Sequence, residues 1–450
     1  MSIPCQLHPE DLSLRQSEII GSLSYALDLT EGLPAGHAQR CCWIGMHIGH
    51  ELALSDQELS DLYYTLLLKD AGCSSNASRI FALYGCDDLS LKRDFKLMDN
   101  DRFYELAKFT WSHIGLGESW RDRLSRLMHL VDKGEQIGQE LFLTRCEQGA
   151  DIAEQLGFSP SVCAGIRALD EHWNGKGSPH HLVGEQIPLF ARIALLAQVV
   201  DVFFAAGGQK AATETVNRRR GSWFDPALVD VFNRIRFLPE LWDGLTDPNI
   251  AQRVVALEPL ALVRNIDADE LDRLTGAFAA VIDAKSPYTF GHSSRVCQYA
   301  ERIAQQLGLS SPQCNWLRHA ALLHDIGKLG VSNAILDKPD KLTDAEFEQV
   351  KLHPVYSQDI LSKVGIFDSL ALVASGHHER IDGKGYPWGL KGEQIDIATR
   401  IISVADVFDA VSAERPYRAA MPLTDALAVL DKMSGSALDG DLVATLKQTL

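Results

Sequence analysis

The C-terminal part of the chain carries histidine and aspartate residues whose types suit metal chemistry. The apolar segment LRHAALLHDIGKLGV leads directly into the adjacent pair His324 and Asp325. A neutral imidazole beside a carboxylate can bind one metal ion or bridge two, and a mixed nitrogen and oxygen set suits iron, manganese or another first-row metal. Such a pair is common, however, and by itself it is much more typical of an ordinary helix end than of a metal site.

Further titratable residues follow this pair in otherwise apolar segments. His353 lies in KLHPVYSQDIL, His377 and His378 are adjacent in SGHHERIDGKGYP, and Asp406 interrupts the apolar run of RIISVADVFDAV. A protein core rarely holds so many ionisable groups unless they are paired or bind a metal. A buried carboxylate at position 406 needs a cation, so we expect a metal site here rather than a surface helix.

Helices must position these residues, because apolar residues recur at helical spacing along most of the chain. LDRLTGAFAAVIDA and VCQYAERIAQQLGL are examples, whereas the alternating pattern of strands is scarce. The 450 residues also exceed the size of one ordinary core. The sequence therefore predicts an all-α protein with more than one domain.

The sequence repeats within itself. GHAQR at residues 36–40 matches GHSSR at residues 291–295, and NGKGSPHHLVGEQI from Asn174 matches DGKGYPWGLKGEQI from Asp382. The offset between the copies falls from 255 to 208 residues, so the first copy carries 47 additional residues, which lie between positions 70 and 145. A repeat of this length is typical of a duplicated domain.

Two tandem helical bundles follow from this repeat. We place the first domain at residues 1–235, a linker at residues 236–265 and the second domain at residues 266–450. Both copies end alike, with GSWFDPALV in the first and GSALDGDLV in the second. The duplication therefore covers whole domains.

The first copy lacks most of the residues that a metal site needs. Lys69 replaces His324, and of the seven ligand positions only His37 and Asp70 keep the ligand residue. A cation at position 69 would repel a metal, so we expect a degenerate, inactive domain in which Lys69 pairs with Asp70 or Asp170. Binding of a regulatory ligand, dimerisation and support of the second domain all remain open as its role.

Composition limits the partners and the compartment. The net charge of −17 argues against general DNA binding, which needs a clustered basic face. No apolar stretch is long enough to span a membrane, and the N-terminus has no signal-peptide pattern. The nine cysteines are scattered without metal-type spacing, which fits reduced thiols. We therefore expect a cytoplasmic protein without a DNA or membrane partner.

The motifs of the second copy resemble those of the HD-GYP phosphodiesterases in order and spacing. They are HDIGK, HP, HHERIDGKGYP, VADVFDAV and RPYR, and the resemblance covers residues 267–450. It implies two tandem HD-type helical bundles, with a degenerate N-terminal copy and a metal-binding C-terminal copy. It also implies hydrolysis of cyclic di-GMP to pGpG or GMP.

The resemblance implies a ligand set for each metal ion. The first ion would take His324, Asp325 and Asp406, with His292 nearby, and the second would share Asp325 as a bridge with His353, His377 and His378. Some family members hold a third metal through a glutamate at the position of Tyr288. Because tyrosine stands there in this chain, we expect two divalent metal ions.

The resemblance also implies catalytic and substrate-binding residues. Lys328 and Arg295 would contact the scissile phosphate and act in catalysis together with Asp325. The remaining expected substrate contacts are Asp382, Lys384, Gly385, Tyr386, Arg415 and Arg418. Two metal ions would lower the pKa of a bridging water, and the resulting hydroxide would attack phosphorus while Lys328 and Arg295 stabilise the developing charge.

Other functions remain open at this point. We expect cyclic di-GMP as the substrate first, and 3′,3′-cyclic GMP-AMP as the alternative, because hydrogen bonds in the pocket decide purine choice. A cyclic dinucleotide receptor that does not hydrolyse its ligand is disfavoured, since all seven ligand positions and Lys328 are kept. A general nucleotide phosphohydrolase would leave the HHE and GYP segments unexplained. A homodimer and a contact between the two domains within one chain also remain open.

Overall fold

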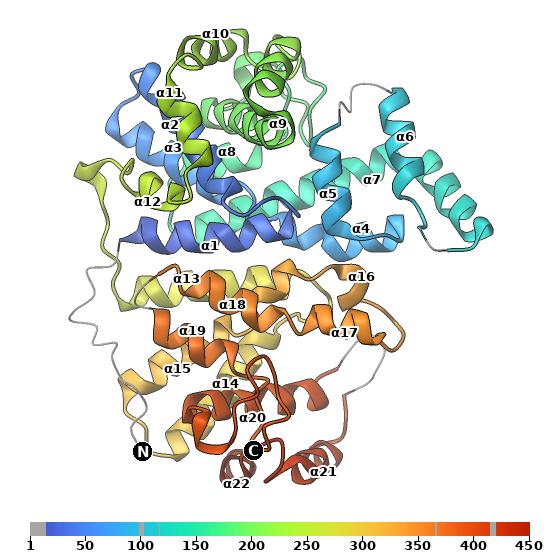
Figure 1. Ribbon diagram of the computed structural model, residues 1–450, viewed down its shortest axis with the longest axis vertical. Coiled ribbons are helices and arrows are strands. Elements are labelled where there is room, and N and C mark those ends of the chain that lie inside the picture. Colours follow the sequence, from blue (N-terminus) through green and yellow to red (C-terminus); the bar gives the residue numbers. More distant parts are fainter. Residues whose placement is uncertain (1–14, 99–102, 117, 365–366, 415–419) are drawn as a thin grey trace. The chain divides into compact units, whose positions relative to one another are not determined.

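The described residues form helices joined by loops and contain no β-strand (Figure 1). This is a computed structural model, and it describes residues 15–98, 103–116, 118–364, 367–414 and 420–450. The predicted all-α fold is confirmed. The chain divides into an N-terminal unit, Leu14–Asn265, and a C-terminal unit, Ile266–Leu450.

In the N-terminal unit, helix α2 lies at the centre and packs against α1, α3 and α9. Ser55 begins α3 with a capping box, in which its hydroxyl accepts from the Glu58 amide and the Glu58 carboxylate accepts from the Ser55 amide. The helices are α1 (Gln16–Thr30), α2 (His37–Glu51), α3 (Asp56–Leu68), η2 (Cys73–Asn76), α4 (Ala77–Tyr84), α5 (Asp88–Lys96), α6 (Phe103–His113), α7 (Trp120–Gln155), α8 (Pro160–Arg167), η3 (Gly184–Gln186), α9 (Leu189–Arg218), α10 (Pro226–Ile235), α11 (Pro239–Thr246), α12 (Ile250–Val255) and η4 (Leu260–Leu262).

In the C-terminal unit, helix α14 lies between α15 and α20, and α18 packs on α19 and on the short turn η5. Asp267 caps the first helix of this unit through a capping box with Glu270. The helices are α13 (Ala268–Asp283), α14 (His292–Gln306), α15 (Ser311–Leu323), η5 (Ile326–Gly330), α16 (Asn333–Leu336), α17 (Asp344–Val350), α18 (His353–Leu361), α19 (Asp368–Ser375), η7 (Gly392–Gln394), α20 (Ile397–Ser412), α21 (Leu423–Met433) and α22 (Gly440–Thr449).

One glycine in each unit lets two helical segments approach at the backbone level. A Cβ atom on Gly327 would collide with the carbonyl oxygen of His353 and approach the Ser357 amide nitrogen to 2.6 Å. A Cβ atom on Gly72 would collide in the same way with Arg145. The glycine of the HDIGK motif is therefore needed to bring the first residue of α18 next to the end of α15.

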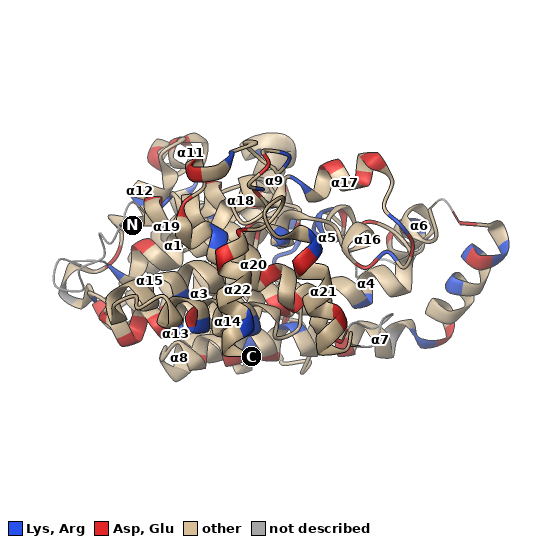
Figure 2. Ribbon diagram, turned by 90° about the horizontal axis from the view of Figure 1, so that it is seen from below, with Lys and Arg blue, Asp and Glu red and all other residues tan. Residues whose placement is uncertain are grey.

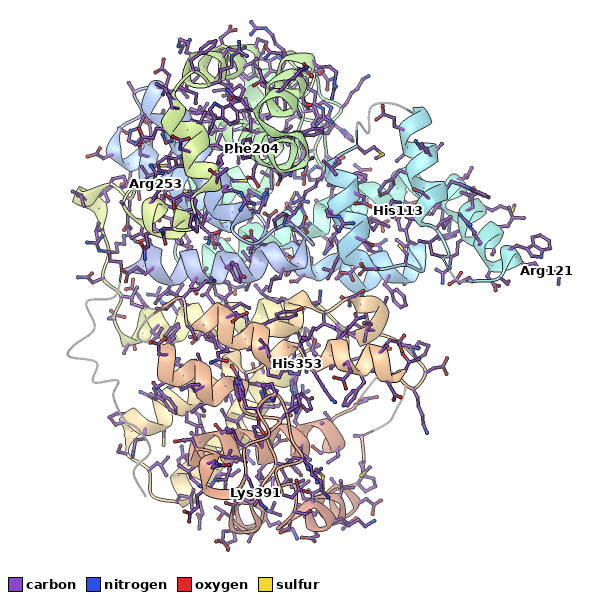
Figure 3. All side chains as sticks on the ribbon, in the orientation of Figure 1. His113, Arg121, Phe204, Arg253, His353 and Lys391 are labelled. Atoms are coloured by element: carbon purple, nitrogen blue, oxygen red, sulfur yellow. The ribbon has the colours of Figure 1, made fainter. Side chains whose placement is uncertain are left out.

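Residues 236–265, which we expected to be a linker, are instead folded onto the N-terminal unit. The indole nitrogen of Trp43 donates to the carbonyl of Leu241 over 3.1 Å, and the guanidinium of Arg253 lies 4.5 Å from the centre of the Trp43 ring. The ring of Phe204, which is labelled in Figure 3, lies 5.4 Å from the ring of Trp242 in α11. The prediction was wrong because buried apolar residues fix this segment to α2 and α9.

The longest apolar helix of the N-terminal unit is a core helix. By length and composition alone, α9 could cross a membrane, but 67% of its most apolar window is buried inside the unit. Acidic and basic segments are interspersed along the described helices (Figure 2). This arrangement differs from the continuous basic stripe that is typical of proteins that bind nucleic acids.

Candidate metal centre

Asp325 is the residue around which the centre is built. The chain leaves α15 at His324 and turns into η5, and this turn places the Asp325 carboxylate, which is 1% exposed, inside the unit. Its oxygen Oδ2 lies 3.3 Å from Nε2 of His324 and 3.5 Å from Nε2 of His292. Its other oxygen, Oδ1, lies 3.4 Å from Nε2 of His353 and 3.6 Å from Nε2 of His377. The two oxygens therefore face two different pairs of imidazoles, as a bridging carboxylate would.

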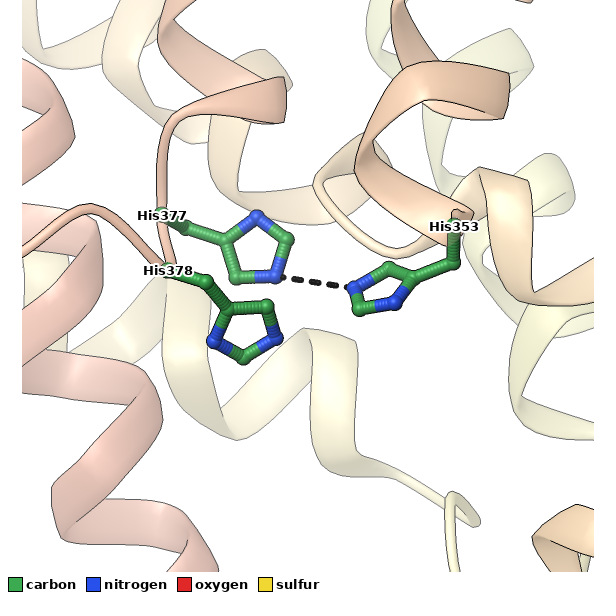
Figure 4. A group of neighbouring side chains, drawn as sticks. All are labelled: His353, His377 and His378. Carbon is green, nitrogen blue, oxygen red and sulfur yellow. Dashed lines mark hydrogen bonds between the residues drawn. The ribbon is translucent and has the colours of Figure 1, made fainter. Parts of the chain in front are cut away.

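The histidines on the Oδ1 side form one compact group. His353 begins α18, and His377 and His378 follow the end of α19. The Nε2 atoms of His353 and His377 are 3.3 Å apart, and the rings of His377 and His378 lie side by side with centroids 4.1 Å apart (Figure 4). Ligand atoms of these three residues all lie within 4.8 Å of one another, close enough to hold one ion.

A second group forms on the Oδ2 side. His292 lies at the start of α14, and Asp406 lies in the middle of α20. Nε2 of His292 is 3.2 Å from Oδ1 of Asp406, and the ligand atoms of His292, His324 and Asp406 lie within 4.8 Å of one another. The structure thus brings all seven residues that we expected to bind metal to a single place.

Backbone hydrogen bonds fix the tautomer of three of these imidazoles. Nδ1 of His324 contacts the carbonyl of Ala321 at 2.7 Å, and the Nδ1 atoms of His353 and His377 make the same contact with carbonyls three residues earlier, each at 2.6 Å. A carbonyl only accepts, so each Nδ1 must carry the proton. This leaves Nε2 unprotonated and directed at Asp325, which is the usual arrangement of a metal-binding histidine.

The electrostatics of the site favour neutral imidazoles at His353, His377 and His378 and ionised carboxylates. Burial lowers the pKa of His292, but its hydrogen bonds to three surrounding carboxylates outweigh burial and raise that pKa. Burial is the main reason that the pKa of His353 falls to about 3 and that of His378 to about 4; Lys328 also lowers both, and Asp325 raises both. Burial raises the pKa of Asp406, but the hydrogen bond and charge of His292 outweigh it and hold that pKa far below its ordinary value. Metals bind neutral imidazoles and ionised carboxylates.

Two buried atoms at the centre indicate that a cation fits there. Nε2 of His324 and Oδ1 of Asp325 are both buried, and neither makes a hydrogen bond of normal geometry within the described part of the chain. Leaving such atoms unpaired in a protein core costs free energy. A metal ion on the Oδ2 side would satisfy Nε2 of His324, and one on the opposite side would satisfy Oδ1 of Asp325, so the donor set fits divalent metals.

Asp409 is a functional residue that the sequence reasoning missed. Its Oδ2 atom lies 2.7 Å from Nδ1 of His292, and it also accepts two hydrogen bonds from Arg295, from Nε at 2.6 Å and from Nη2 at 3.1 Å. Nη1 of Arg295 donates to the carbonyl of Phe290. Each terminal guanidinium nitrogen carries a second N–H group, and the Arg295 side chain is 36% exposed. Arg295 therefore holds Asp409 and His292 in place, and its expected contact with substrate phosphate stays a prediction.

Lys328 stands beside the bridging carboxylate. Its Nζ atom lies 2.5 Å from Oδ2 of Asp325, and its side chain is 21% exposed. The ammonium group therefore borders the centre and reaches its open side. This position suits the contact with substrate phosphate that the sequence predicts.

The GYP loop covers the histidines. The ring of Tyr386 lies 4.8 Å from that of His378, and burial raises the Tyr386 pKa. A Cβ atom on Gly385 would lie 2.6 Å from the carbonyl oxygen of His378 and as close to Cα of Glu379. The sequence reasoning gave Glu379 no role, yet it is buried and accepts from the amides of residues 388–390, which shapes the loop.

The other expected substrate contacts are less well placed. Asp382 is paired with Arg380 and also accepts from the backbone amide of Lys384, so it stabilises its own turn. The Lys384 side chain is exposed. Arg415 and Arg418 lie outside the described residues.

In the N-terminal unit, lysine ammonium groups lie at the positions that correspond to the candidate metal sites of the C-terminal unit. Nζ of Lys69 contacts Asp70, and it lies 3.0 Å from Nε2 of His37 and 3.1 Å from Oε1 of Gln198. In the repeat, the three contacted residues correspond to His292, Asp325 and Asp406, the candidate ligands on the Oδ2 side of the C-terminal unit. Nζ of Lys96 lies 3.8 Å from the other oxygen of Asp70. Lys69 therefore pairs with Asp70, whereas Asp170 pairs with Arg145.

Comparisons with known proteins agree with this geometry. The family model of the HD domain matches residues 125–228 and 277–442. The 3′3′-cGAMP-specific phosphodiesterase 3 of Vibrio cholerae serotype O1 is 50% identical over 434 residues, which are 96% of this chain and 94% of that protein. The cyclic di-GMP phosphodiesterase response regulator RpfG of Xanthomonas campestris pv. campestris is 38% identical over 206 residues, 44% of this chain and 53% of that protein. The crystal structure of a cyclic GMP-AMP-specific phosphodiesterase of V. cholerae covers 97% of both chains with a TM-score of 0.68 and 46% identity.

Proposed function

This chain belongs to the HD domain family, and from that premise we propose that it is a phosphodiesterase whose substrate is 3′,3′-cyclic GMP-AMP. The relatives that this chain matches are phosphodiesterases of cyclic dinucleotides. The observation that carries the proposal is the convergence of four imidazole Nε2 atoms on the two oxygens of Asp325. Imidazole and carboxylate ligands in this arrangement can hold metal ions that catalyse the cleavage of a phosphodiester bond.

The choice of substrate rests on similarity along the whole chain. The relative that is specific for 3′3′-cGAMP matches nearly the full length of both units, whereas the cyclic di-GMP phosphodiesterase RpfG matches less than half of this chain. The sequence alone had placed cyclic di-GMP first. The similarity favours the alternative, so cyclic di-GMP becomes the second candidate.

We propose two divalent first-row metal ions at the centre. The ligands of one would be His292, His324, Asp325 and Asp406, and those of the other Asp325, His353, His377 and His378. When bound, the ions supply Lewis acidity, which lowers the pKa of a water molecule and draws negative charge from the phosphodiester.

The residues of the chain then have separate tasks. Lys328 faces the open side of the centre and would stabilise the negative charge that develops on the phosphoryl oxygens. Tyr386 would form an aromatic wall beside His378, on which a purine base can stack. Arg295 and Asp409 hold His292 in its orientation, and the exposed edge of the Arg295 guanidinium would also contact the phosphate.

We propose that the N-terminal unit is a degenerate copy that does not hydrolyse the substrate, because lysines stand where metal ions would lie. We also place the protein in the cytoplasm. The eight cysteines within the described residues are all unpaired, which fits a reducing compartment.

Turnover of two substrates, measured side by side, tests the proposal. The purified protein, loaded with Mn²⁺ or with Fe²⁺ under reducing conditions, is given 3′,3′-cyclic GMP-AMP or cyclic di-GMP, and the products are separated by chromatography. We expect kcat/KM for the hybrid dinucleotide to exceed that for cyclic di-GMP at least about tenfold. Equal or reversed values would return cyclic di-GMP to first place. Binding without hydrolysis of either would instead support a receptor.

A further inference from the structure

The N-terminal unit contains a cavity of about 210 Å³ at the place that corresponds to the metal centre of the other unit. Cys73, Arg145, Asp170 and Gln198 line it, and the repeat aligns them with Lys328 and with three metal-ligand positions. The cavity is therefore a former active site whose metal chemistry is lost and whose volume remains.

Lysines pair with the two carboxylates, Glu31 and Asp70, that together with Cys73 could otherwise hold a metal ion at this cavity. Lys69 and Lys96 both point their ammonium groups at Asp70, and Lys96 also pairs with Glu31 at 2.7 Å. All four side chains are buried. Each cation is thus neutralised by a carboxylate within the protein, and the floor of the cavity offers no site for a second cation.

Aromatic side chains form the walls, and part of them comes from the additional residues of this copy. Tyr84 ends α4, Phe95 lies in α5, and Phe142 lies on α7. Trp223 completes the lining, and its ring stacks on that of His172 with centroids 4.0 Å apart. Walls of this kind favour a flat aromatic ring as the ligand, because stacking on aromatic faces accepts any planar base.

The loop at the mouth of the cavity corresponds to the GYP loop, which lies beside the metal centre in the C-terminal unit. Lys176, Gly177 and Ser178 line the cavity and are the repeat counterparts of residues 384–386. Lys176 is exposed, and the guanidinium of Arg145 lies 5.9 Å from the centre of the Phe142 ring. A cation beside an aromatic wall suits a ligand that carries both a planar ring and an anionic group.

We propose that this cavity binds a purine nucleoside 5′-monophosphate without hydrolysing it. The base would lie between the aromatic walls, and the phosphate would lie toward Lys176 and Arg145. A cavity of about 210 Å³ is smaller than most small-molecule pockets, so it favours the smaller ligand, a mononucleotide, over a cyclic dinucleotide. The choice of nucleotide rests on the proposed function, because complete hydrolysis of a cyclic dinucleotide releases nucleoside monophosphates. The site is then a sensor of the end product.

Binding of GMP and of AMP to the full-length chain tests this proposal by isothermal titration calorimetry. Phe142→Ala removes one aromatic wall, and Leu143→Ala, at a neighbouring position of α7 that is 40% exposed and does not line the cavity, is its matched control. Lys176→Glu reverses the charge at the mouth, and Lys210→Glu is the control for that change, since its side chain is 86% exposed on α9. All four changes are at exposed or half-buried positions and leave the core intact.

We expect one nucleotide per chain outside the metal centre, with the Kd raised at least about fivefold by Phe142→Ala and by Lys176→Glu and unchanged in both controls. Lys328→Ala distinguishes the two sites, because it should leave this binding unchanged. Affinity lost only in Lys328→Ala would place the nucleotide in the metal centre and overturn the proposal. No binding of either nucleotide at millimolar concentration would also overturn it. Hydrolysis of 3′,3′-cyclic GMP-AMP, measured on the same samples, tests the proposed function separately.

Discussion

Oδ2 of Asp409 lies 2.7 Å from Nδ1 of His292, and both residues are buried. Asp201 makes the same contact with His37 at 2.7 Å in the N-terminal unit. In the C-terminal unit the contact turns Nε2 of His292 toward Asp325 and Asp406. The contact between this aspartate and this histidine is therefore present in both units, but only in the C-terminal unit does the histidine face the candidate metal centre.

Asp409→Asn should weaken metal binding about 10- to 100-fold, because an amide no longer fixes the orientation of His292 as firmly as a carboxylate does. Mn²⁺ affinity, measured by titration of the metal-free protein, checks this expectation. Asp201→Asn is the matched control and should leave the affinity unchanged. If both variants bind Mn²⁺ as the wild type does, Asp409 has no part in orienting His292.

Lys328→Ala should reduce kcat by about 10²-fold or more while the protein keeps its metal. Lys328 contacts Oδ2 of Asp325 and faces the open side of the centre. Its ammonium group can therefore stabilise the negative charge that develops on the phosphate. Steady-state turnover together with metal analysis of the same sample separates the two effects. A loss of metal in parallel with the loss of activity would show that Lys328 only supports the ligands.

Lys69→Met should destabilise the N-terminal unit by about 3 kcal/mol, because it leaves the buried Asp70 carboxylate with only the more distant Lys96 ammonium group, 3.8 Å away, as its partner. Urea unfolding measures the change. The double variant Lys69→Met with Asp70→Asn removes both charges and should recover much of the loss. Unchanged stability of the single variant would mean that the ammonium group does not replace a metal ion in holding this unit together.

His172 should make the N-terminal unit less stable as the pH falls. Burial, followed by the charge of Arg219, lowers the His172 pKa to about 3. The unfolded chain therefore takes up a proton below about pH 6.5 that the folded chain does not, so stability is full above that pH and declines toward pH 3. Between pH 7 and pH 5 the loss is about 2 kcal/mol. His172→Phe should remove this part of the pH dependence in unfolding experiments, and an identical pH profile would contradict the assignment.

The sequence predicted the helical fold and every proposed metal ligand, because the ligands lie in short motifs whose chemistry is visible locally. His324 and Asp325 are neighbours, and Asp406 interrupts an apolar run. Asp409 escaped notice because its partner His292 is 117 residues away, although the matching repeat residues His37 and Asp201 carry the same signal. Such pairs become evident only when the helices are placed in space.

The misplaced linker and the unforeseen contacts of Arg295 have the same origin. Residues 236–265 contain polar and turn-forming residues, and only the packing of Trp242 against α9 reveals that they belong to a core. Arg295 lies in a motif that suggests phosphate binding, and only the structure shows that its donors also bind Asp409 and the carbonyl of Phe290. Local sequence indicates which groups are present, and tertiary contacts decide which of them remain available to a substrate.

The central claim is that hydrolysis takes place at the centre around Asp325, and a matched pair of variants tests it most directly. Turnover of 3′,3′-cyclic GMP-AMP is measured for Asp325→Asn and for Asp70→Asn, which changes the equivalent carboxylate of the N-terminal unit. We predict that Asp325→Asn abolishes turnover and lowers metal content, whereas Asp70→Asn retains both. Turnover that survives in Asp325→Asn, or that is lost only in Asp70→Asn, would contradict the account.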